Sequence, residues 1–88
     1  MPSRIVTITN KRGLHARASA KFVTLASELA ATSRVEKDGN GVVGTSIMGL
    51  MMLGAAMGDS VVIHTQGKDA DEALAKLVAL VESRFGED

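Results

Sequence analysis

The pattern of hydrophobic and polar residues changes several times along this chain, and each change marks a different expected element. Residues 5–9 are β-branched throughout and end at a polar loop, residues 10–13, a pattern that predicts a strand followed by a loop. Over residues 16–31 the apolar side chains recur at the spacing of one helix face, which predicts an amphipathic helix. The positions on that face include Phe22, Leu25, Ala26 and Leu29.

The middle of the chain predicts a hairpin and then a short helix. Two β-type runs, residues 33–37 and 41–44, flank an Asp-Gly pair at positions 38 and 39, which is a strong hairpin signal. Ser46, or the threonine before it, can cap a brief helix over residues 47–53, which a glycine ends.

The last third of the chain predicts one more strand and one more helix. Residues 60–66 are rich in β-branched side chains and form the strand. Asp69 and Glu72 have the spacing of a capping box at a helix start, and Gly86 suits the end of that helix. The apolar face of this helix consists of Ala73, Leu74, Leu77, Val81 and Phe85.

The expected order is therefore β-α-β-β-α-β-α, in one domain that spans residues 1–88. Helices with one apolar stripe and four short strands fit a two-layer, open-faced α/β (α+β) sandwich. Its sheet is four-stranded and mainly antiparallel, with the helices on one face. Because 88 residues leave no room for a second core, function should use exposed loops or helix ends.

Composition narrows the function classes. Ten basic residues balance ten acidic ones, which gives no sign of a nucleic-acid or membrane partner. The chain has no cysteine, so disulfides and thiolate metal sites are excluded. A membrane span needs about 18 apolar residues, and no apolar run in this chain is that long. We expect a cytoplasmic protein with no metal and no cofactor.

The most informative segment places His15 where the first long helix is expected to begin. A helix start leaves backbone N–H groups unpaired and favours anions. Because a histidine stands in place of the usual capping residue, the N–H groups of Ala16, Arg17 and Ala18 are expected to stay free for a phosphate. Arg17 can pair phosphate oxygens and Arg12 adds positive charge, which should favour a neutral, nucleophilic His15 ring.

Two segments resemble a known family. The run GLHAR at positions 13–17, after a strand and at a helix start, closely resembles the active-site segment of the histidine-containing phosphocarrier proteins of the bacterial phosphotransferase system. This HPr family includes a nitrogen-regulatory branch, NPr. The run TSIMGLMML at positions 45–53 resembles the family's short helix with its regulatory serine. Order, spacing and length also match over essentially the whole chain.

The resemblance implies a phosphoryl carrier and not an enzyme with its own turnover. His15 would accept a phosphoryl group from the phosphohistidine of enzyme I and pass it to a histidine of an EIIA-type acceptor domain. Arg17 would steady the phosphate, and Ser46 would be a regulatory site for an HPr kinase/phosphorylase. The carrier would work as a monomer.

An exposed apolar surface is expected on the short helix, since its methionines exceed what one side of two turns can bury. Flexible methionines suit a carrier that must fit both donor and acceptor. The residues expected to dock partners are Ile47, Met48, Met51 and Met52.

Two positions depart from the family pattern. Ala18 stands where the family commonly has proline, which adds an N–H donor and should leave phosphate binding intact. Arg12 stands where the family often has a small polar residue, which leaves open whether a side-chain hydrogen bond orients the His15 ring, and Arg12 could contact phosphate directly.

Other features of the sequence point to different functions less strongly. Residues 39–44 spell G-x-G-x-x-G, but these glycines fall in a hairpin and no dinucleotide site is expected. The main alternative is a regulatory module of βαββαβ type that binds an anionic metabolite without covalent chemistry. Whether the acceptor serves sugar transport or nitrogen regulation stays open at this point.

Overall fold

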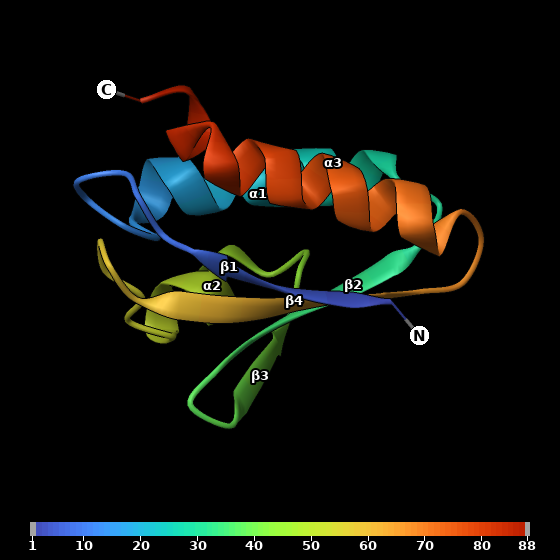
Figure 1. Ribbon diagram of the computed structural model, residues 1–88, viewed down its shortest axis with the longest axis horizontal. Coiled ribbons are helices and arrows are strands. Elements are labelled where there is room, and N and C mark those ends of the chain that lie inside the picture. The colour runs from blue at the N-terminus through green and yellow to red at the C-terminus, as the bar shows by residue number, and fades with distance from the viewer. Residues whose placement is uncertain (1, 88) are drawn as a thin grey trace.

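Two long helices lie side by side over one face of a four-stranded sheet (Figure 1). The computed structural model describes residues 2–87. Its elements are β1 (Ser3–Thr7), α1 (Ala16–Glu28), β2 (Thr32–Lys37), β3 (Asn40–Val43), α2 (Ile47–Met52), β4 (Ser60–Gln66), α3 (Ala70–Glu82) and the 3₁₀ turn η1 (Arg84–Gly86). The expected order and the open-faced α/β sandwich are confirmed.

The sheet has the strand order β1-β4-β2-β3, and each neighbouring pair is antiparallel. Val6 pairs with Val61 and Val35 pairs with Ile63, so these four side chains share the inner face. All four are buried against the helices. The opposite face carries the alternate residues, among them the exposed Ile5, and both long helices lie on the other side of the sheet.

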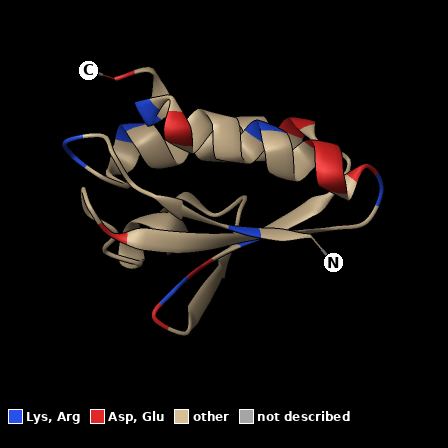
Figure 2. Ribbon diagram, in the orientation of Figure 1, with Lys and Arg blue, Asp and Glu red and all other residues tan. Residues whose placement is uncertain are grey.

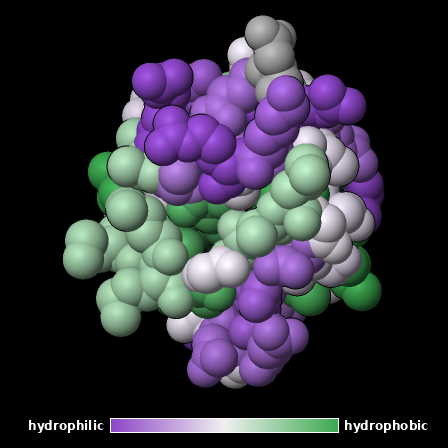
Figure 3. Space-filling view, turned by 90° about the vertical axis from the view of Figure 1, so that its left-hand side faces the viewer, coloured by the Kyte–Doolittle hydropathy of each residue, from purple (hydrophilic) through white to green (hydrophobic). Residues whose placement is uncertain are grey.

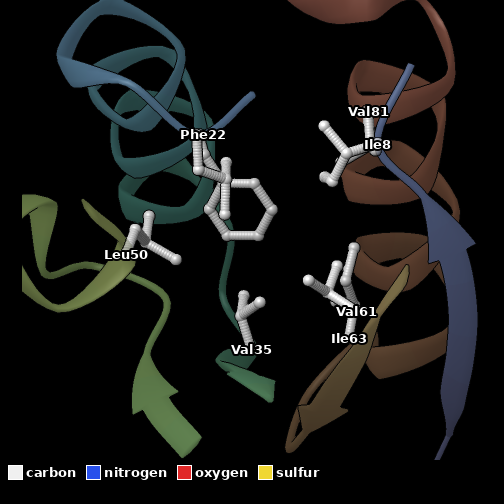
Figure 4. A pocket seen from close by; sticks show the side chains of 8 residues that line it. Ile8, Phe22, Val35, Leu50, Val61, Ile63 and Val81 are labelled. Atoms are coloured by element: carbon white, nitrogen blue, oxygen red, sulfur yellow. The ribbon is translucent and has the colours of Figure 1, made fainter. Parts of the chain in front are cut away.

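The core joins both layers and the short helix. Figure 4 shows side chains from the strands and from α1, α2 and α3 pointing toward one another around a small apolar gap. Phe22 of α1 and Leu50 of α2 are both buried there, so α2 is fixed to α1 through its one fully buried residue. Close packing of this kind fixes the position of α2 relative to α1.

Two predicted boundaries are wrong by a few residues. β1 covers Ser3–Thr7 instead of residues 5–9, because β4 begins opposite Thr7. Ile8 instead exchanges hydrogen bonds with the turn just before β4, donating to the Asp59 carbonyl at 2.8 Å and accepting from the Gly58 N–H at 2.8 Å. α1 ends at Glu28 instead of residue 31, since Leu29 has the extended backbone (φ −94°, ψ 147°) that leads toward β2.

The ends of the last helix also differ from the prediction. Asp69 precedes α3 in the left-handed region (φ 57°) and its side chain makes no capping hydrogen bond, so the predicted capping box is wrong. The acidic Glu72 still lies in the first turn, where its negative charge interacts favourably with the helix dipole. Phe85 is buried as expected, but it belongs to η1 and not to α3. Within residues 2–87, no helix is long and apolar enough to cross a membrane.

Candidate active site

A tightly held loop between β1 and α1 positions His15. The Leu14 N–H donates to the Ala55 carbonyl at 2.9 Å, which ties this loop to the segment after α2. Gly13 has φ +62°, and a side chain there would collide with the same carbonyl. The buried Asn10 closes the loop from within, since its Nδ2 donates to the Gly13 carbonyl at 2.8 Å. The sequence therefore specifies a rigid approach to the histidine.

His15 is itself the N-cap of α1. Its Nδ1 accepts a hydrogen bond from the Arg17 N–H at 3.3 Å, and its carbonyl accepts from the Ser19 N–H at 2.9 Å. The expectation that the Arg17 N–H stays free is therefore wrong: the imidazole nitrogen does what a serine or aspartate oxygen does at other helix starts. The N···N distance of 3.3 Å is slightly longer than the about 2.7–3.2 Å that is usual for a backbone N–H donor.

The other two predicted backbone donors differ in access. The N–H groups of Ala16 and Ala18 have no partner among residues 2–87. Ala16 is exposed, whereas Ala18 is fully buried beneath the helix start. The helix start therefore offers a bound anion a donor at Ala16 more readily than at Ala18.

The far side of the His15 ring meets a carboxylate that sequence reasoning missed. Nε2 of His15 lies 2.7 Å from Oε2 of Glu87, and Oε1 of Glu87 accepts from Asn10 Nδ2 at 3.1 Å. A donor at Nδ1 and an acceptor at Nε2 both select the tautomer with the proton on Nε2. The lone pair of the ring therefore belongs to Nδ1, which faces the start of α1.

The charge of Glu87 is stabilised by its contacts. Partial burial acts to raise the pKa of Glu87, but the hydrogen bonds from His15 and Asn10 and the charges of His15 and Lys21 outweigh it. The pKa of Glu87 therefore lies below its usual range. The sequence predicted an entirely positive setting for the histidine, and this carboxylate offsets that field.

Basic side chains gather at the same end of the molecule. Figure 2 shows Lys and Arg residues on the loop before α1, on the first turns of α1 and after α3. Arg12 and Arg17 are exposed, and neither makes an ion pair within residues 2–87. Both residues are therefore accessible from solvent.

Helix α2 presents the predicted apolar residues to solvent. Ile47, Met48, Met51 and Met52 are all exposed, and Met48 and Met52 reach 67% and 79% exposure. We call these four side chains the α2 patch. Figure 3 views this end of the molecule and shows an apolar area directly beside a hydrophilic one. An uncovered apolar surface next to a polar site is typical of a protein contact area.

Ser46 is the N-cap of α2, and it was one of the two capping residues that the sequence suggested. Its Oγ accepts a hydrogen bond from the Gly49 N–H at 3.0 Å. The residue is half-buried, at the edge of the α2 patch. Ser46 thus adjoins the apolar surface rather than the histidine itself.

Comparisons with known proteins agree with this arrangement. Residues 2–83 match the family model described as PTS HPr component phosphorylation site. The chain is 47% identical to the phosphocarrier protein HPr of Cupriavidus necator over 87 residues, covering 99% of this chain and 98% of the relative. It is 43% identical to the phosphocarrier protein NPr of Shewanella violacea over 84 residues, covering 96% and 92% of the two chains.

The fold comparison leads to the same family. The crystal structure of HPr-C-His from Thermoanaerobacter tengcongensis superposes with a TM-score of 0.95 at 45% identity, covering 100% of this chain and 99% of that one. Fold and comparisons together define a phosphocarrier protein. The chain belongs to the HPr family of the phosphotransferase system.

Proposed function

We propose that this protein carries a phosphoryl group on Nδ1 of His15, taken from the phosphohistidine of enzyme I and passed to a histidine of an EIIA-type domain. The observation that carries the proposal is the His15 ring at the start of α1, with Nδ1 toward the helix and Nε2 on a carboxylate. The protein is then an intermediate substrate of transferases and not an enzyme. The exchange needs no cofactor or metal, and we expect it in the cytoplasm.

The helix start suits the product of this transfer. Once Nδ1 is bonded to phosphorus, it no longer accepts the Arg17 N–H, so that donor turns to a phosphoryl oxygen. The exposed Ala16 N–H supplies a second donor, and the dipole of α1 favours the added negative charge. The side chains of Arg17 and Arg12 can pair the remaining oxygens from solvent. An open arrangement of this kind stabilises phosphate without enclosing it.

The α2 patch is the surface on which we expect both partners to dock. Its exposed methionines are flexible and polarizable, which lets one surface fit a donor and an acceptor of different shape. The Leu14–Ala55 hydrogen bond ties the active loop to the segment that follows α2. A partner seated on the patch is thereby held in a fixed relation to His15.

Regulation at Ser46 follows from its position beside the patch, with an HPr kinase/phosphorylase as the proposed partner. In Ser46→Asp a carboxylate oxygen can still cap the Gly49 N–H, so the free energy of unfolding should change by less than about 1 kcal/mol. The new charge borders an apolar docking surface, and transfer to the acceptor is expected to fall about tenfold. Urea unfolding and the rate of phosphoryl transfer measure the two effects.

Ser46→Ala is the matched control for that substitution. It removes the cap of α2, at a cost of about 1 kcal/mol, but adds no charge. Transfer by this variant should stay close to that of the native protein. Equal transfer rates in Ser46→Asp and the native protein would contradict the regulatory role.

The function itself is tested by incubating the protein with enzyme I and labelled phosphoenolpyruvate. The expected product carries one label that acid removes and alkali does not, as a phosphoramidate bond requires. A metabolite-binding module without covalent chemistry, the alternative from the sequence, would take up no label that survives denaturation. Absence of covalent label from the native protein therefore decides against the carrier.

A further inference from the structure

The last described residues of the chain turn back over the start of α1. Three consecutive residues, Arg84 (φ 60°), Phe85 (φ 54°) and Gly86 (φ 73°), have left-handed backbones. This conformation is unfavourable for the two that are not glycine. The Phe85 side chain is buried in the core and anchors the turn. The strained turn directs Glu87 toward the histidine.

Contacts from separate elements hold Glu87 in place. Lys21 of α1 donates to the Phe85 carbonyl at 2.6 Å, and the Glu87 N–H donates to the Arg84 carbonyl at 2.9 Å. Asn10 of the active loop donates to one carboxylate oxygen, and Nε2 of His15 meets the other. The side chains of His15 and Glu87 are only 14% and 16% exposed. The carboxylate is thus a fixed part of the site and not a free surface charge.

We propose that Glu87 is a positioning residue for phosphoryl transfer, which keeps the proton on Nε2 of His15 and stabilises the positive charge that the ring gains when Nδ1 binds phosphorus. This inference rests on the proposed function. A buried carboxylate plays the comparable part when it orients the histidine of a catalytic triad. Arg12, in the loop before His15, has no hydrogen-bond acceptor to offer the ring. In this chain the acceptor for Nε2 is a carboxylate from the segment after α3.

The proton on Nε2 stays in place while the phosphoryl group is transferred to Nδ1. The Nδ1 lone pair forms the new N–P bond, while the N–P bond of the donor phosphohistidine breaks and its electron pair returns to the donor ring. The His15 ring becomes an N-phosphoryl imidazolium, whose charge lies against the Glu87 carboxylate at 2.7 Å. In the onward step the N–P bond breaks and its electron pair returns to Nδ1. A protonated ring is the better leaving group for this step.

Other charges near the ring oppose that cation. The charged side chains on the loop, on the first turns of α1 and on η1 are Lys11, Arg12, Arg17, Lys21 and Arg84. All of them are positive, whereas Glu87 is the one carboxylate that contacts the ring within residues 2–87. The Glu87 carboxylate, 2.7 Å from Nε2, is therefore the group that can offset the positive charge of the phosphorylated ring.

Two variants test the role of this carboxylate. Glu87→Gln keeps the shape of the side chain and removes its charge, and Glu87→Ala removes the contact. In both, ¹⁵N NMR of the neutral ring in the unphosphorylated protein should show a smaller share of the tautomer with the proton on Nε2 than in the native protein. After loading with phosphoramidate, the half-life of the phosphohistidine at neutral pH should lengthen about threefold to tenfold.

Glu82→Gln is the matched control, since Glu82 is an exposed carboxylate at the end of α3. It should match the native protein in both measurements, and Glu87→Asp, which keeps the charge, should recover part of the native behaviour. Equal tautomer populations and equal half-lives in Glu87→Gln and the native protein would overturn the role of Glu87 alone. Failure of the native protein to accept phosphate from either donor would overturn the proposed function and this role together.

Discussion

His15→Ala is expected to reduce labelling from phosphoenolpyruvate and enzyme I to background, a complete loss of phosphoryl acceptance. The imidazole Nδ1 is the nucleophile in the proposed transfer, and alanine has no lone pair to take its place at the start of α1. Covalent label in the protein band, followed over time at fixed donor concentration, measures this effect directly.

His64→Ala is the control for that experiment, because His64 is the only other histidine in the chain. It lies on the outer face of β4, 3.1 Å from a carboxylate oxygen of Glu36, and is expected to leave labelling unchanged. His15→Ala also removes the N-cap acceptor of α1, which should cost about 1 kcal/mol of unfolding free energy. Urea unfolding separates that modest loss from the lost chemistry. Label on the His15→Ala protein would place the acceptor elsewhere.

Most of the fold could be predicted because local patterns and tertiary packing agree in this chain. The β-branched run that forms β4 and the helical stripe that includes Phe22 both contribute buried side chains to the core. The Asp-Gly pair also forms the turn between β2 and β3, with Asp38 and Gly39 both at positive φ. Where each level of description favours the same structure, sequence alone suffices.

The errors occur where tertiary contacts override a local signal. Asp69 has the spacing of a cap, yet the turn after β4 places it in a left-handed conformation from which its side chain does not reach the helix. Phe85 fits the stripe of α3, yet the helix ends at Glu82 and the aromatic ring enters the core from a reversed turn. Neither outcome is visible in a window of a few residues.

The candidate site likewise contains residues that the sequence identified and one residue that it did not. His15 and Arg17 stand at a helix start that the sequence marks clearly, and the structure places them there. The contact between His15 and Glu87 joins positions 72 residues apart, and no spacing rule links a histidine to an acid near the chain end. A carboxylate after an aromatic-glycine pair was the one available hint, and it gains meaning only when Phe85 is seen to be buried.

The site therefore combines a fixed ring with an open surface. Hydrogen bonds to Nδ1 and Nε2 hold the imidazole of His15, whereas Arg12 and Arg17 remain exposed. Preorganising the nucleophile lowers the cost of reaching the transition state, and mobile cations let the phosphoryl group leave again. A carrier needs both properties, since it must gain and lose the same group.

Charging the α2 patch is expected to have the second largest effect, a loss of about 100-fold in the rate of transfer from enzyme I for the double variant Met48→Glu, Met52→Glu. Both side chains are mostly exposed, so the substitutions should leave the unfolding free energy within about 1 kcal/mol of native. Docking on the proposed surface would then require two carboxylates to lose their hydration where methionine side chains are expected to be buried. Transfer rates measured over a range of carrier concentrations give the size of the loss.

Ile5→Glu provides a control of matched chemistry, because Ile5 is 69% exposed and lies on the outer face of β1, away from the helices. It changes an exposed apolar side chain to the same acid without touching the proposed docking surface. If Ile5→Glu slowed transfer as much as the double variant, the loss would reflect net charge and not docking. A selective loss in the double variant would instead identify the α2 patch as the surface that brings the donor to His15, and the same variant should then slow transfer to the acceptor.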